Sequence, residues 1–558
     1  MTFALLPTSF ADASQYPPNA PAPWNGTPTT RLIRATVSGI ATAVVPPAVP
    51  DVRIGSLQPL FGADFFDRIH ITPLTLALGN VISTQDRELW VWNAFRSRAV
   101  TLTAMPVSGT EGMTIRAPAP LPLAFPPMTE RVWGVSISTS GPPTIAATIT
   151  YQFDGFDDIT VTITGSRVVV FPFRPNWSSP FNETLSFLTA VERAFDGSEQ
   201  RTPLRDRPRR IFEYSLAVLD GEHAYFESLL FGWQDRLYAV PIWPERSNLT
   251  AAADAGALSI VCDTADRTLV EGGLLLLYRN TRTFEAAFIT GIAGDVVSVQ
   301  TPLTRAWPAG TRVYPLQLAM LNEQTQLQYA TDRYLTAAVR FTADPVTSDP
   351  RLPALPAPET DQGIELVRTH TNWRDGMTVG YTADAHLHDN NTGAFQLRPR
   401  SGLPQVTRQH TWFLKGRPAI SAFRAFLGRR QGRAASLWMP TGTDDLVLVA
   451  DIAAGAQALQ VRDNGYHQFA SHHPARSRVL LELRDGTWRA LTITGTADLG
   501  DGITQLTITP AIPTAIVRAA VRRLSYLGRY RLNSDDITLT WHSGVVAEAI
   551  TELALVKD

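Results

Sequence analysis

The sequence predicts an all-β protein. Its expected parts are an N-terminal immunoglobulin-like β-sandwich and two homologous β-sandwich modules, each with one short helix and an inserted small β-barrel. Three observations lead to this prediction. Short runs rich in Val and Thr alternate apolar and polar residues, 41 Pro and 37 Gly residues divide these runs, and one block recurs after about two hundred residues. Alternation with period two, bounded by turn residues, is typical of strands.

Composition limits the class of protein. A chain of 558 residues is too long for one core and is expected to form three or four domains. The 49 basic and 51 acidic residues give a net charge of -2, which excludes a global basic field for nucleic acid. The single cysteine, Cys262, excludes an intramolecular disulfide, and because it ends the apolar run 258–262 we predict that it lies in a core.

Residues 1–45 are predicted to form an extended Pro-rich N-terminal arm, since Tyr16-Pro17-Pro18 and Pro21-Ala22-Pro23 interrupt any periodicity. No basic segment precedes the short apolar run at the start, so we expect no signal peptide. No run approaches the roughly 20 apolar residues of a membrane helix, so no membrane anchor is expected.

Residues 46–170 are predicted to form the immunoglobulin-like sandwich. Leu89 and Val91 alternate with Trp90 and Trp92, and the run 145–153 reaches a turn before the run 159–164 returns. Such alternation indicates antiparallel sheets buried on one face. The cysteine pair of antibody domains is absent.

The repeated block gives the two modules. The first spans 171–345 and the second 371–558, joined by a Pro-rich linker at 346–370. Matching residues form an assembly and structural signature: Trp177, Arg210, Phe226, Gln234, Arg236 and Trp243 in the first copy, and Trp373, Arg408, Phe423, Gln431, Arg433 and Trp438 in the second. Two copies are too few for a solenoid, so the duplication predicts a pseudo-symmetric architecture.

Each copy has one segment with helical spacing. Phe226, Leu229 and Leu230 predict a helix ended by Gly232, and the run 420–427 predicts one ended by Gly428. Strand-like runs follow each Trp-Pro signature and precede the closing strand, which predicts inserted barrels at about 250–318 and about 452–525.

Catalytic and cofactor motifs are missing. The sequence contains no P-loop, nucleophile elbow, HExxH or cysteine cluster, so we predict no catalytic, cofactor-binding or metal-binding residue and no cofactor. His386 and His388 are the best metal candidates, but the turn at 389–393 favours a solvated hairpin end. Three adjacent carboxylate pairs are interpreted as turn and strand-end residues: Asp157-Asp158, Asp444-Asp445 and Asp535-Asp536.

Arginines concentrate between Arg201 and Arg210. They either contact nucleic acid in a channel or pair with acidic residues of a neighbouring subunit, and the second reading is favoured. Arg236 and Arg433 follow the two helices, which suggests that they close the turn from helix to strand.

The paired signatures also carry a resemblance. A basic strand, a short helix ending near a Gly…Gln-x-Arg turn and an aromatic strand with Trp243-Pro244 or Trp438-x-Pro440 recur in both copies. This pattern, over residues 171–556, resembles the distal tail and tail-hub proteins of long, flexible-tailed bacteriophages and related gene transfer agents. In that family the module is a β-sandwich that assembles into rings continuing the tail tube, and hub members carry two modules.

The resemblance implies a structural virion protein of the tail tip or baseplate, assembled in the bacterial host cytoplasm, that is not an enzyme. It would be a ring-forming hub joining the tail tube to the central fibre or receptor-binding apparatus. Its expected partners are further copies of itself, the tube or distal tail ring, the tape measure protein and central fibre proteins, with DNA passing only transiently through the lumen. Tubes are sixfold and fibres threefold, so a trimer of two-module chains is favoured over a hexamer.

Two other classes of function stay open. A receptor- or carbohydrate-binding tail protein is the alternative, because 13 Trp and 13 Tyr residues lie on many predicted strands. A polysaccharide hydrolase is the third, and it needs two carboxylates converging in a cleft.

Overall fold

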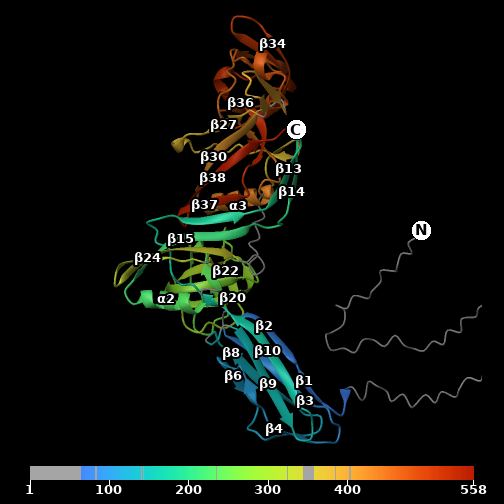
Figure 1. Cartoon of the computed structure of the whole chain (residues 1–558), viewed down its shortest axis with the longest axis vertical. Helices are drawn as coiled ribbons and strands as arrows, with labels where there is room; N and C mark the ends of the chain where they lie inside the picture. Colours follow the sequence, from blue (N-terminus) through green and yellow to red (C-terminus); the bar gives the residue numbers. More distant parts are fainter. Residues whose placement is uncertain are drawn as a thin grey trace, which may run out of the picture. The chain divides into compact units, whose positions relative to one another are not determined.

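The computed structural model describes residues 65–557 except 82–83, 140, 143, 234–235, 323, 344–356, 384 and 401–403. These residues belong to one compact unit, Phe65–Asp558. Strands dominate it and confirm the all-β prediction (Figure 1). The predicted arm at 1–45 and residues 346–356 of the predicted linker lie outside the described residues.

Two sheets enclose the first core. One has the order β1-β3-β8-β6, and the other has β2-β10-β9-β4-β7 with β5 beside β9. The strands are β1 Ile69–Thr72, β2 Thr75–Val81, β3 Gln85–Asn93, β4 Val100–Ala104, β5 Val107–Ser108, β6 Met113–Arg116, β7 Leu123–Phe125, β8 Glu130–Ile137, β9 Thr144–Phe153 and β10 Ile159–Arg167. Burial alternates along β9 as its sequence predicts, and Trp133 stacks on Phe125 at the centre.

The first repeat contributes the following elements: β11 Val169–Val170, β12 Phe181–Ser186, β13 Thr189–Arg193, β14 Glu199–Pro203, β15 Arg209–Leu219, α2 Glu222–Trp233, β16 Leu237–Pro241, the 3-10 turn η2 Trp243–Glu245, β17 Ser247–Asn248, β18 Ser259–Val261, β19 Leu274–Asn280, β20 Thr283–Ala293, β21 Val296–Val299, β22 Arg312–Leu321, β23 Leu327–Thr331 and β24 Tyr334–Ala343. Phe226 of α2 is fully buried beside the rings of Phe171 and Phe173.

The second repeat contributes these elements: β25 Thr360–Asp361, β26 Ile364–Glu365, η3 Trp373–Asp375, β27 Val379–Thr382, β28 Ala385–Asp389, β29 Phe395–Pro399, β30 Gln405–Lys415, α3 Arg417–Arg430, β31 Leu437–Pro440, β32 Ala456–Arg462, η4 Tyr466–Ala470, η5 Pro474–Arg476, β33 Arg478–Leu483, β34 Trp488–Asp498, β35 Ile503–Ile512, η6 Arg518–Ala520, β36 Val521–Leu532, β37 Asp536–Ser543 and β38 Val546–Leu555.

The two repeats match strand by strand. β28 begins 196 residues after β13 (Ala385 against Thr189), and β29 and β30 follow β14 and β15 at the same distance (Phe395 against Glu199, Gln405 against Arg209). β38 begins 212 residues after β24 (Val546 against Tyr334). Even the turns agree, since the backbone N–H groups of Asn176 and Asn372 donate to the carbonyls of Ser215 and Thr411.

Each repeat has an insertion with its own core. In the first, a separate apolar cluster runs from Leu249 to Val313, and the pairing order β17-β22-β19-β20-β21-β18 returns to β17 through the bridge between Leu249 and Cys262. In the second, the corresponding cluster runs from Leu446 to Tyr526. Cys262 is fully buried in the core of the first insertion, as its apolar neighbours predict.

The end of α3 differs from the expectation. The helix does not stop at Gly428 but runs to Arg430, and Gln431 in the left-handed conformation ends it, with its N–H donating to the Leu427 carbonyl. The extra turn is stabilised because Arg430 and Arg429 both bind the buried carboxylate of Glu365. Gly232 likewise lies inside α2, which ends at Trp233.

The described end of the predicted linker is packed. Residues 357–370 contain β25 and β26, and Glu365 is 8% exposed between α3 and the sheet. Leu366 bridges Trp438, and Val367 joins the main core. This segment therefore belongs to the structure of the second repeat.

Candidate assembly interface between the two repeats

One sheet passes from the first repeat into the second. β12 pairs antiparallel with β37, and the register places Phe181 opposite Trp541 and Ser186 opposite Asp536. The hydroxyls of Thr184 and Thr538 hydrogen-bond across this pair at 2.8 Å. Outside the two insertions, buried side chains from both repeats form one apolar cluster, so the duplicated modules share a core.

Four buried charges lie beside this strand pair. Arg210 of β15 donates to Glu183 of β12 at 2.7 and 2.9 Å, and Arg424 of α3 donates to Glu183 and to Glu245, each at 2.5 Å. We call these residues the charge cluster. All four residues are at most 6% exposed, and the indole N–H of Trp541 gives Glu183 a further donor at 3.0 Å.

The cluster is electrically balanced, with two carboxylates and two guanidinium groups. Burial acts to raise the pKa of Glu245, but Arg424 and Arg210 outweigh it and lower this pKa to about 2. The pKa of Glu183 is also lowered, because the same two arginines overcome its burial. Both carboxylates are therefore ionised at neutral pH, and removing one charge leaves another unpaired in the core.

This arrangement predicts a pH dependence of stability. The fall from 4.5 to about 2 for Glu245 corresponds to about 3 kcal/mol, which is present above pH 4.5 and is lost as the pH falls toward 2. Denaturant unfolding at a series of pH values would show this decline. In the Glu245→Gln variant the decline over the same window should be shallower by about that amount. An unchanged decline would contradict the assignment.

A long hairpin forms the second contact. β13 and β14 pair with each other and run from the first repeat along β38 of the second (Figure 1). Glu199 of β14 accepts two hydrogen bonds from Arg531 of β36 at 2.7 and 2.9 Å, and Arg201 donates to Ser436 at 2.9 Å. A paired carboxylate and guanidinium of this geometry fix position as well as contributing energy.

The base of the hairpin is held by Asp535. Its carboxylate accepts from the backbone N–H and the hydroxyl of Thr189 and from the backbone N–H of Arg433. Arg433 returns a hydrogen bond to the Thr189 carbonyl at 2.9 Å. Gly432, at φ 67, lies between them, and a Cβ there would be 2.2 Å from the Asp535 carboxylate, so this turn requires glycine.

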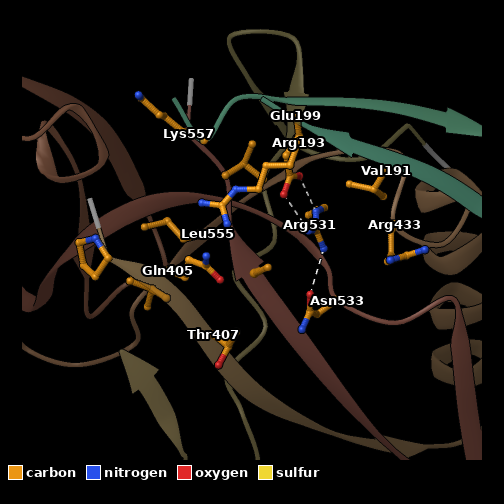
Figure 2. A pocket seen from close by; sticks show the side chains of 15 residues that line it. Val191, Arg193, Glu199, Gln405, Thr407, Arg433, Arg531, Asn533, Leu555 and Lys557 are labelled. Atoms are coloured by element: carbon orange, nitrogen blue, oxygen red, sulfur yellow. Dashed lines mark hydrogen bonds and ion pairs between the residues drawn. The ribbon is translucent and has the colours of Figure 1, made fainter. Parts of the chain in front are cut away.

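A pocket of about 270 Å³ opens under the hairpin. Figure 2 shows Arg531 between Glu199 and Asn533, with Val191, Arg193 and Arg433 around it. Arg531 binds both Glu199 and Asn533, so its charge is used in holding the hairpin. The polar residues of this pocket therefore hold two parts of the chain together.

The signature residues separate into several places. Arg210, Gln431 and Arg433 lie at the interface between the repeats. Phe226, Phe423, Trp243 and Trp438 are buried, whereas Trp177 and Trp373 are 43% and 50% exposed. Arg236 packs over Trp233, Arg408 is buried and donates to the Pro440 carbonyl, and Gln234 lies outside the described residues.

The strand register corrects one equivalence. The sequence aligns Arg210 with Arg408. In the strand ladders, Phe212 of β15 lies opposite Phe341. Arg408 of β30 lies opposite Leu553, which is the residue equivalent to Phe341 in the second repeat. Arg408 therefore corresponds to Phe212, and Arg210 to Val406. The reason is the side-chain period of two in strands, which lets an arginine move by two residues and keep its face.

Sequence reasoning missed Glu183, Glu245, Arg424 and Arg531. It placed Asp535 at a turn or strand end but did not predict its contact with Thr189 of the first repeat. One signal was available for Arg424, because it interrupts the apolar face of a helix between Ile420 and Leu427. A charge on a buried helix face needs a partner.

Three arginines of the arginine-rich run face protein, whereas Arg207 and Arg209 are exposed. Arg210 binds Glu183 of the same repeat, Arg201 donates to Ser436 of the second repeat, and Arg205 donates to the carbonyls of Ser186 and Phe187. The carboxylate pair Asp444-Asp445 serves a turn, since Asp445 accepts from Thr443 and from the backbone N–H of Tyr526.

No known protein-family model matches the chain, and no curated protein sequence matches it. Within the described ranges, no group of three or more His, Cys, Asp or Glu side chains is placed to hold a metal ion. Among the same residues, no helix has the length and apolar character to cross a membrane.

Proposed function

We propose that this chain is a structural protein of the tail tip of a long, flexible-tailed bacteriophage. Its role would be that of a ring-forming hub that joins the tail tube to the central fibre or receptor-binding apparatus and encloses a lumen for DNA. The tail assignment rests on the resemblance of the paired signatures. The ring rests on the structure of the contact between the repeats.

One observation carries the ring. β12 of the first repeat pairs with β37 of the second, although the strand equivalent to β12 is β27 and the strand equivalent to β37 is β23. Two copies of one module are thus joined through different surfaces, head to tail. Repeated contacts of this kind build a closed ring when the rotation closes. Three chains supply six modules, which matches a sixfold tube to a threefold fibre.

The mass of the native particle tests this proposal. We expect light scattering to give three times the chain mass and negative-stain class averages to show a central hole. The particle should be measured over a wide range of concentration, because ring closure depends on it. A compact monomer without a hole at every concentration would contradict the hub.

The alternative is a receptor- or carbohydrate-binding tail protein. It needs exposed aromatic rings on one surface. Trp177 and Trp373 are exposed, but they occupy the same position in the two repeats, directly after Asn176 and Asn372. Their placement follows from the duplication, so it does not by itself indicate a sugar-binding surface.

A further inference from the structure

The two surfaces that meet inside the chain have unpartnered equivalents. β12 binds β37, but β27, its equivalent, pairs only with β30 among the described strands, and β23, the equivalent of β37, pairs only with β24. Their side chains are exposed, including Tyr381 at 63% and Tyr329 at 47%. An open sheet edge of this kind is a template for pairing with another chain.

The hairpins show the same asymmetry. β13–β14 is docked on the second repeat, whereas its equivalent, β28–β29, is exposed along almost its whole length. The docked face of the first hairpin carries Thr189, Glu199 and Arg201. The matching face of the second carries Leu387, Phe395 and Leu397, which are 56%, 71% and 59% exposed, with Asp389 opposite Phe395 at its end. Apolar side chains gathered on one exposed face indicate an interaction site.

The chemistry of the free surfaces is complementary. Inside the chain, Glu199 binds Arg531. The residue equivalent to Glu199 is Phe395. The residue equivalent to Arg531 is Met320 of β22, which is 52% exposed. The second internal pair is Arg201 with Ser436. Their equivalents are Leu397 and the half-buried Leu237, which lies opposite Met320 in the strand ladder. Both polar pairs of the internal contact thus become apolar pairs.

The charge cluster changes in the same sense. Val379 stands in β27 where Glu183 stands in β12, and Val406 replaces Arg210. Tyr329 occupies the position of Trp541, so an aromatic ring is kept at the end of the acceptor strand.

We propose that β27 and the β28–β29 hairpin dock on β23 and β22 of a second copy of this chain. The register of the internal contact gives the pairing: Thr378 faces Gln328, as Asn182 faces Thr540, and Phe395 packs on Met320. Apolar pairs link the chains, and charged pairs link the repeats within each chain. The two junctions are then chemically distinct, so neither hairpin competes for the site of the other. This inference rests on the proposed function, since it specifies how the ring closes.

Paired cysteines test the register. The Thr378→Cys/Gln328→Cys variant should form covalent trimers under oxidation and single chains after reduction. The Asn182→Cys/Thr540→Cys variant is the matched control and should close within one chain. Each single-cysteine variant should give no cross-link, and native Cys262 is fully buried.

The outcomes separate the two proposals. If the protein is a trimer with a hole and only the control pair closes, this interface is wrong and the hub stands. If the protein is a monomer by mass and image, both proposals fall. A ladder of covalent species extending past the trimer would support the interface and contradict the closed ring.

A surface substitution gives a second test. Phe395→Asp removes the largest apolar side chain of this face and adds a second carboxylate opposite Asp389. It should lower the particle mass threefold, with an unchanged unfolding transition of the chain because the side chain is exposed. Phe195→Asp is the control, since Phe195 lies in the turn of the first hairpin and is 78% exposed. An unchanged mass for Phe395→Asp, or an equal loss for both variants, would overturn the proposal.

Discussion

Replacing Arg424 by methionine is expected to lower the free energy of unfolding by about 3–5 kcal/mol. Of the two arginines in the charge cluster, Arg210 belongs to the first repeat and Arg424 to the second. Arg424 binds both Glu183 and Glu245. Without it, the two buried carboxylates keep Arg210, and Glu245 keeps the electrostatic interaction with Arg417. The loss can be measured by denaturant unfolding at neutral pH.

The matched control is Arg368→Met. Arg368 binds Glu359 at 2.8 Å with similar geometry, but the two side chains are 27% and 48% exposed. A surface pair of this kind contributes at most about 1 kcal/mol. Equal effects of the two substitutions would show that burial does not distinguish the pairs, and the charge cluster would then have no special part in joining the repeats.

The Phe226→Ala variant is expected to lose about 3–5 kcal/mol as well, for a different reason. Phe226 is fully buried, and its ring centroid lies 4.9 Å from that of Phe173 and 6.0 Å from that of Phe171. Removing the ring leaves a cavity between α2 and the sheet, because both neighbouring rings belong to the fixed core. Thermal and denaturant unfolding would both report the change.

The same helix supplies the control. Phe231 is 97% exposed, five residues further along α2, so Phe231→Ala should change stability by less than about 0.5 kcal/mol. The pair of variants compares one residue type on two faces of one helix. If Phe231→Ala were as costly as Phe226→Ala, the orientation of α2 on the sheet would be wrong.

The local patterns located the strands with regular alternation and both predicted helices. Alternation in the run 145–153 became β9 with alternating burial, and the apolar run ending at Cys262 entered a core. Helical spacing located α2 and α3 because the apolar face of each packs on the sheet. The helix ends were less accurate, since contacts with Glu365 decided where α3 stops.

The sequence by itself determined the class of fold and the duplication, because period-two alternation and repeated signatures are properties of neighbouring residues. Only the tertiary structure decided which repeated surfaces meet. Glu183 and Trp541 are 358 residues apart, and Glu199 and Arg531 are 332 apart. A strand edge pairs through its backbone, so its side chains give little sign of its partner. The apolar face of the second hairpin indicates an interaction site only when it is compared with the docked, polar face of the first hairpin. The strand ladders supply the alignment for this comparison.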